Sequence, residues 1–244
     1  DLDELRGLVT LYLYDVIGIN ETWLDLQSRN LAAEIMLPGY KMFSVDKPTP
    51  SKRGGGSLLY IKEMLHPFLR TTHATVSCEI LNAEIKVAHA TLKLSLVYRN
   101  SHILAEHDAQ LYEKLEEIVS NNHETIIFGD FNLPYIDWVS LASQAPGNKL
   151  TKFIADHGLT QYVREPTRGN NILDIVMSTE ECLVGNILVG NKLGGADHNM
   201  VEFTIQVPRP APQGAIRRPN FARADFQGMR EQLSALNLRS EERR

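Results

Sequence analysis

Short runs of apolar and β-branched residues recur along this chain, and turns or amphipathic segments separate them. Such runs are typical of buried strands. We expect strands at residues 15–19, 57–61, 125–128, 173–177 and 201–205, and a hairpin or two successive strands across 84–98. Apolar residues at helical spacing predict helices at the start of the chain and over residues 107–120 and 150–157. This alternation favours a mixed α/β protein of layered sheets covered by helices.

The composition allows a substantial core and excludes several classes of protein. The 244 residues are 43% hydrophobic, which is too apolar for a disordered chain. No stretch approaches the roughly 18 apolar residues of a membrane span, and two cysteines are too few for a disulfide scaffold. Residues 1–4 have neither the basic segment nor the apolar run of a secretory signal. We therefore expect a nuclear or cytoplasmic protein that does not contact a membrane.

Charge and proline content divide the chain into two parts. The formal net charge is −5, and this total alone argues mildly against a nucleic-acid binder, whose usual surface is basic. Residues 207–214 are rich in proline and predict a linker that ends the core. We expect one domain over residues 1–207, and over 208–244 a linker with the start of a following module. The alternative for residues 208–244 is a flexible terminus.

Carboxylate and amide side chains stand next to the predicted strands. Glu21 follows one strand, Asp130 and Asn132 follow another, and Asp174 begins a third; the pair Asp197-His198 precedes the last strand. Such groups either face solvent or converge on a shared site at the strand ends. Oxygen ligands with one histidine suit Mg²⁺ or Mn²⁺ rather than zinc. Such an ion can stabilise charge on a phosphate while a His or Asp activates water.

Each of these groups also has a purely structural explanation. Glu21 could be the acid in the first turn of a helix, and the Asp130 segment could be an ordinary turn. Asp197-His198, in a glycine-rich loop, could be a turn as well. Asp174 is harder to explain in this way, because an unpaired carboxylate inside an apolar strand is costly.

The same residues, taken in order, resemble the endonuclease/exonuclease/phosphatase family. They match best its branch in LINE-type, jockey-like non-LTR retrotransposons, over roughly residues 1–207. The segments that carry the resemblance are D-V-I-G-I-N-E-T-W-L (15–24), G-Y with R-G-G-G (39–40, 53–56), V-Y-R (97–99), G-D-F-N (129–132), P-T-R with L-D (166–168, 173–174) and A-D-H (196–198). Residues 220–226 resemble the connector that leads toward a reverse transcriptase in such elements.

The resemblance implies a DNase I-like four-layer sandwich, in which two packed, mixed β-sheets are flanked by helices. It also implies a metal site in which Glu21 holds Mg²⁺, or Mn²⁺, with Asp197 near it or assisting. Contacts with the DNA backbone are implied for four residues: Trp23, Arg53, Arg99 and Arg168.

The catalytic roles implied by the resemblance fall on five residues. Asp130 would orient or deprotonate the attacking water, and Asn132 would hydrogen-bond the phosphate. His198, held by Asp174, would be the general base or the cation that stabilises the transition state. Tyr98 would donate a hydrogen bond to that transition state.

The sequence departs from the family pattern in three places. The family carries an asparagine on a first strand, and no asparagine precedes Asn20 here. Loss of that strand would leave a neighbouring strand edge unpaired, so we expect reduced stability and little or no catalysis from this chain alone. Ala196 replaces a serine, and residues 98–100 lack the prolines that usually follow.

The resemblance therefore predicts an endonuclease domain that nicks DNA to prime reverse transcription. Its partners would be DNA and a reverse transcriptase module that follows it in the same polyprotein. One alternative is a catalytically inactive relic of a decayed element. Another is a relative that hydrolyses small phosphoesters or phospholipids.

Overall fold

The computed structural model describes residues 2–24, 32–46, 54–87, 90–101, 108–120, 123–143, 147–206 and 227–228. The chain divides into two units, Asp1–Pro208 and Arg209–Arg244. Apart from residues 227–228, the linker and connector predicted over 208–244 lie outside the described residues. Among the described residues, no helix combines the length and the apolar character needed to cross a bilayer.

The first unit alternates strands and helices along the chain. Its helical elements are α1 (Leu2–Tyr12), α2 (Ala32–Ile35), the 3-10 turn η2 (Glu63–Leu65), α3 (Ala109–Val119) and α4 (Gly147–Asp156). Its strands are β1 (Val16–Asn20), β2 (Tyr40–Val45), β3 (Ser57–Lys62), β4 (Phe68–Ala74), β5 (Cys78–Val87), β6 (Ala90–Arg99), β7 (Thr125–Asp130), β8 (Ile136–Asp137), β9 (Ala142–Ser143), β10 (Thr160–Gln161), β11 (Asp174–Ser178), β12 (Val184–Lys192) and β13 (Asn199–Ile205).

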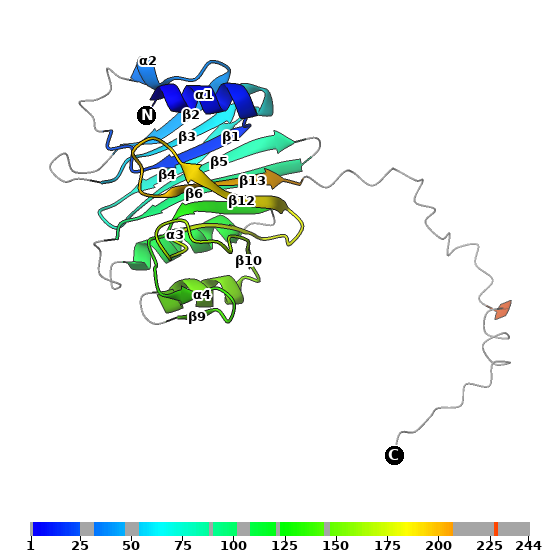
Figure 1. Ribbon diagram of the computed structural model, residues 1–244. Coiled ribbons are helices and arrows are strands. Elements are labelled where there is room, and N and C mark those ends of the chain that lie inside the picture. Colours follow the sequence, from blue (N-terminus) through cyan, green and yellow to red (C-terminus); the bar gives the residue numbers. More distant parts are fainter. Residues whose placement is uncertain are drawn as a thin grey trace. The chain divides into compact units, whose positions relative to one another are not determined.

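The strands form one large sheet and smaller ones beside it. The large sheet has the order β10-β11-β7-β6-β5-β4, and its one parallel pair joins β6 to β7. A three-stranded antiparallel sheet has the order β1-β3-β2, and β12 and β13 form a hairpin. Figure 1 shows α1 and α2 on the outer side of the three-stranded sheet, with α3 and α4 beyond the large sheet.

Alternating side chains along the strands create separate cores on the two faces of the large sheet. On β6, Leu94 and Leu96 pack with Leu59 of β3 and with Phe203 of β13, so the smaller sheets cover one face. Val97 points to the other face and packs with residues of α3 and α4. A third cluster joins Leu5 and other α1 residues to the outer face of β3. The predicted four-layer arrangement of helices and two sheet layers is therefore confirmed.

β1 and β13 are edge strands of the two smaller sheets. Among the described residues, β1 pairs with β3 alone and β13 pairs with β12 alone. Both strands lie against the large sheet: a Cβ on Gly18 of β1 would meet Phe128 at 2.7 Å, and Phe203 of β13 contacts the same ring edge-on. The hydroxyl of Tyr14 also donates to Glu202 of β13 at 2.8 Å. Each strand thus keeps one unpaired row of backbone groups.

Candidate active site

Asp130 and Asp174 lie side by side at the ends of adjacent antiparallel strands. They are register partners in the β7–β11 pair, and Asp130 is buried with 3% of its surface exposed. The chain before Asp130 must pass very close to β6, because a Cβ on Gly129 would lie 2.0 Å from the carbonyl oxygen of Val97. With its φ of 133°, this position favours glycine strongly. The glycine of the G-D-F-N motif therefore sets the approach of β7 to β6.

Asn132, two residues after Asp130, donates two hydrogen bonds to the Asp130 carboxylate. Its backbone N–H donates to Oδ1 of Asp130 at 2.9 Å, and its Nδ2 donates to Oδ2 at 2.7 Å. The same Nδ2 donates to the carbonyl of Arg99 at 2.9 Å. Both hydrogens of the Asn132 amide are thus used inside the protein. This departs from the expected contact with phosphate and gives Asn132 the task of orienting Asp130.

Asp174 and His198 form a hydrogen-bonded pair beside Asp130. Nδ1 of His198 lies 2.7 Å from Oδ2 of Asp174, which leaves Nε2 as the ring atom available to a substrate or a water molecule. The fully buried Thr167 sets the position of both residues. Its hydroxyl accepts from the backbone N–H of Asp174, and its carbonyl accepts from that of Asn199. Thr167 stands in the P-T-R motif but was not among the expected site residues.

One oxygen or nitrogen atom from each of Asp130, Asp174 and His198 lies within 4.8 Å of the other two. Burial, followed by the charge of Asp174, raises the pKa of Asp130. Burial alone would lower the pKa of His198, but the hydrogen bond and charge of Asp174 outweigh it, and the net shift is upward. Burial and the charge of Asp174 thus disfavour the ionised form of Asp130, a cost that a bound cation would offset. This donor set suits a divalent cation with a preference for oxygen ligands.

Glu21 and Tyr98 join this group from different sheets. Glu21 follows β1 with a φ of 54°, and its Oε1 accepts a hydrogen bond from the Tyr98 hydroxyl at 2.8 Å. Burial, followed by the charge of Glu21, raises the pKa of Tyr98 far above its ordinary value, so the phenol stays a donor. The charge of Asp130 also contributes to that shift. The structure thus brings Glu21, Tyr98 and Asp130 to one end of the two sheets.

Three further residues expected to bind metal or DNA are Asp197, Trp23 and Arg53. The first two have exposed side chains. The Asp197 side chain is 63% exposed and pairs with Arg168 at 2.5 Å, outside the convergent group of three. Trp23 is 60% exposed, with its backbone N–H bonded to the carbonyl of Gly55. Arg53 lies outside the described residues.

The expected role of Arg99 in DNA contact is wrong for this structure. Arg99 is 2% exposed, and its Nε and Nη2 donate to the two carboxylate oxygens of the fully buried Asp108 at 2.9 and 3.0 Å. A third nitrogen donates to the carbonyl of Asn132 at 3.4 Å. The ion pair therefore supports the Asn132 turn from inside the core. Asp108 escaped notice because an aspartate just before a helix resembles a helix cap.

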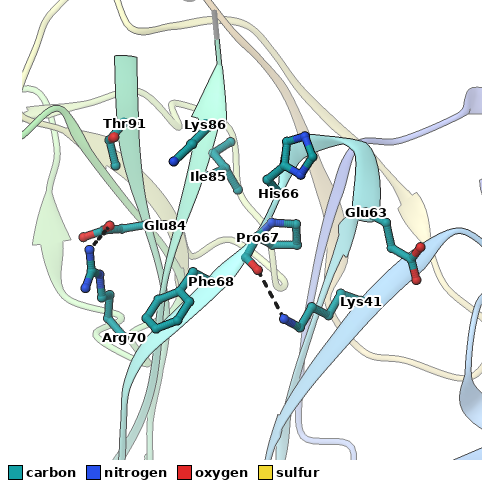
Figure 2. A pocket seen from close by; sticks show the side chains of 10 residues that line it. All are labelled: Lys41, Glu63, His66, Pro67, Phe68, Arg70, Glu84, Ile85, Lys86 and Thr91. Atoms are coloured by element: carbon teal, nitrogen blue, oxygen red, sulfur yellow. Dashed lines mark hydrogen bonds and ion pairs between the residues drawn. The ribbon is translucent and has the colours of Figure 1, made fainter. Parts of the chain in front are cut away.

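A pocket lies at the opposite end of the large sheet. Figure 2 shows its lining, which includes Lys41, His66 and the ion pair of Arg70 with Glu84. It also includes Thr91 near the start of β6, whereas Tyr98 stands near the end of that strand. Seven residues of strand span roughly 23 Å. The pocket is therefore separate from the Asp130 group.

Comparison with known proteins agrees with this fold. Residues 92–202 match the family model described as endonuclease-reverse transcriptase, while no curated protein sequence matches the chain. The endonuclease domain of TRAS1, a telomere-specific non-LTR retrotransposon, has 17% identity and a TM-score of 0.63, covering 85% of this chain and 93% of that domain.

Two further solved structures share the architecture. An endonuclease/exonuclease/phosphatase family protein from Leptotrichia buccalis has 16% identity and a TM-score of 0.59, covering 84% of this chain and 92% of the other. The mannosyl-6-phosphatase Bt3783 from Bacteroides thetaiotaomicron has 14% identity and a TM-score of 0.55, covering 82% and 89%. The resemblance seen in the sequence is confirmed by the family model matched over residues 92–202 and by this shared fold, which is that of the endonuclease/exonuclease/phosphatase proteins.

Proposed function

We propose that this protein is a metal-dependent DNA endonuclease whose nicks prime reverse transcription in a retrotransposon. The observation that carries the proposal is the convergence of Asp130, Asp174 and His198 within 4.8 Å, beside the hydrogen-bonded Glu21 and Tyr98. The matched family model and the retrotransposon origin of TRAS1 support DNA as the substrate. They also support a reverse transcriptase module as the partner in the full polyprotein.

The proposed metal position lies between the two sheets. Mg²⁺ or Mn²⁺ would be held by Glu21 from the smaller sheet and Asp130 from the larger one. When bound, the cation supplies positive charge opposite the phosphate oxygens on which negative charge develops. Asp197 would join as a ligand only after leaving Arg168, with which it is paired.

The protein's own groups would then carry the proton transfers and the positioning. Asp130, kept in orientation by Asn132, would orient or deprotonate the attacking water. Asp174 fixes Nδ1 of His198, so that Nε2 would take up a proton or donate to a phosphate oxygen. The Tyr98 phenol, held protonated by its surroundings, would donate a hydrogen bond to the same phosphate once its one hydrogen leaves Glu21.

Replacement of Trp23 is expected to weaken DNA recognition without stopping the reaction. Trp23 is a large exposed aromatic residue two positions after Glu21, and a hydrogen bond from its indole N–H to a charged phosphate of the DNA backbone would contribute about 1.5–3 kcal/mol. We expect Trp23→Ala to raise the KM for DNA about fivefold or more, with kcat retained. The control is Tyr12→Ala on α1, which removes another exposed aromatic ring. Equal KM values for the two variants would remove Trp23 from the DNA interface.

The substrate class is tested by comparing two reactions of the same protein in Mg²⁺. We expect nicking of supercoiled plasmid DNA, at the low rate expected of this chain, and no release of phosphate or headgroup from an inositol phosphate or a phospholipid. The fold shared with a mannosyl-6-phosphatase supports the second candidate, hydrolysis of small phosphoesters. Turnover of the small substrates without nicking would establish that candidate instead. A folded protein that acts on neither substrate would be the inactive relic.

A further inference from the structure

Glu79 is a buried carboxylate that connects the two sheets at the edge of the candidate active site. It stands on β5 opposite Tyr98 of β6, with 3% of its surface exposed. Its Oε1 accepts from the backbone N–H of Gly56 at 2.8 Å, and its Oε2 accepts from the hydroxyl of Ser57 at 2.7 Å. Gly56 is the last residue of the glycine turn, and Ser57 is the first residue of β3 in the smaller sheet. One side chain of the large sheet therefore fixes the start of β3.

The two residues that Glu79 contacts, together with Gly55 before them, also bond to the residues on both sides of Glu21. Before Glu21, Nδ2 of Asn20 donates to the Ser57 hydroxyl at 3.1 Å. After it, the N–H of Thr22 donates to the carbonyl of Gly56 at 3.0 Å. The N–H of Trp23 likewise donates to the carbonyl of Gly55 at 2.9 Å.

The backbone around Glu21 needs this support because its conformation is uncommon. Glu21 and Trp23 have φ values of 54° and 57°, a region that side-chain-bearing residues rarely adopt. The turn that holds them is tight as well, because a Cβ on Gly56 would lie 2.5 Å from Oγ1 of Thr22. Such a conformation persists when the surrounding hydrogen bonds determine it.

We propose that Glu79 is a positioning residue that sets the distance between Glu21 on the smaller sheet and the Asp130 group on the large sheet. This inference rests on the proposed function, in which Glu21 and Asp130 hold one cation together. Glu79 has no ligand role in this account, and its contribution is the pair of hydrogen bonds that it accepts from Gly56 and Ser57. It acts on the site through the turn that carries Glu21. Residues that orient metal ligands in this way typically change metal affinity or activity by 10–100-fold when they are replaced.

The test compares Glu79→Gln and Ser57→Ala with the unsubstituted 244-residue chain. Glutamine keeps the size of the side chain but removes its charge, and Ser57→Ala removes the link to Asn20. We expect Glu79→Gln to weaken Mn²⁺ binding, measured by isothermal titration calorimetry, by about 10–100-fold. The Mg²⁺ concentration for half-maximal nicking should rise by a similar factor, with the rate largely recovered at saturating Mg²⁺. Ser57→Ala should act in the same direction and more weakly.

Amide hydrogen exchange gives a readout that does not depend on metal or activity. The N–H groups of Thr22 and Trp23 should exchange faster in Glu79→Gln than in the unsubstituted chain. The matched control is Ser95→Ala, which removes a buried hydrogen bond to Asn82 on the same two strands and should change neither readout. A folded Glu79→Gln with unchanged exchange and unchanged Mn²⁺ affinity would overturn the proposal. If Glu79→Gln does not fold, the same two results for Ser57→Ala decide it.

Failure of the proposed function would look different. In that case the unsubstituted chain would neither bind Mn²⁺ nor nick DNA. The exchange of Thr22 and Trp23 would still show whether Glu79 holds the turn that carries Glu21.

Discussion

Replacement of His198 by alanine is expected to lower the rate of plasmid nicking by about 10²–10⁴-fold, the usual contribution of a general acid or base. Nε2 of His198 is the ring nitrogen left free by Asp174, so it is the ring atom that can exchange a proton with the substrate. Asp174→Asn should also reduce the rate, because it removes the charge that raises the pKa of His198. The measurement is the single-turnover rate of nicking in Mg²⁺, relative to the unsubstituted chain.

The protein offers a matched control for this pair elsewhere. Nε2 of His157 lies 2.8 Å from a carboxylate oxygen of Glu116, so His157→Ala removes the same chemistry outside the site. We expect this variant to nick DNA at the unsubstituted rate. Equal rates for His198→Ala and His157→Ala would contradict the assigned role of His198. Because all variants share one chain, a low absolute rate does not affect the comparison.

Loss of either partner of the Arg99–Asp108 ion pair is expected to destabilise the fold by about 3–5 kcal/mol, because the remaining charge stays buried without its partner. Both side chains are nearly or fully buried, so water cannot replace the missing group. Domains of this kind are stable by about 5–15 kcal/mol, so the loss is a large part of the total. The free energy of unfolding of Arg99→Ala and Asp108→Ala, measured by urea denaturation, tests this.

A double variant separates buried charge from simple loss of packing. Arg99→Met with Asp108→Leu replaces both charges by apolar groups, and such replacements often preserve stability. We expect it to be more stable than either single alanine variant. Lys152→Ala, which breaks an exposed ion pair on α4, should cost about 1 kcal/mol or less. If Arg99→Ala and Asp108→Ala are each as stable as Lys152→Ala, the buried pair does not support the core.

Strands with uninterrupted apolar runs could be predicted from the sequence, and strands with mixed faces could not. The runs at residues 57–61 and 125–128 correspond to β3 and β7, whose side chains are almost all buried. In contrast, β4 and β12 are exposed along much of their length. Their polar residues interrupt the apolar pattern, so these strands were not predicted. The run expected at 84–98 became the β5–β6 hairpin, which begins at Cys78. Residues 78–83 of β5 were not predicted because they include the buried polar residues Glu79 and Asn82.

The same reasoning explains which site residues could be anticipated. Asp174 stood out because a carboxylate in an apolar strand needs a partner, and the structure gives it His198. Glu79 carries the same signal, but its partners are the backbone N–H of Gly56 and the hydroxyl of Ser57, which no sequence pattern marks as partners of a carboxylate. Arg99 was misjudged because a basic residue beside a motif for phosphate chemistry suggests phosphate contact. Its burial depends on Asp108, and only the fold shows that pairing.

The central claim is that Glu21 and Asp130, brought together from two sheets, hold a cation that drives cleavage of a phosphodiester. The most direct test is nicking of supercoiled plasmid by the unsubstituted chain, Glu21→Ala and Asp130→Asn, in Mg²⁺ and in EDTA. Because the sequence predicts little catalysis from this chain, we expect the unsubstituted chain to nick slowly and in Mg²⁺ alone, and a loss of at least about 10²-fold from that rate in both variants. Nicking that persists in EDTA, or that neither substitution reduces, would contradict the claim.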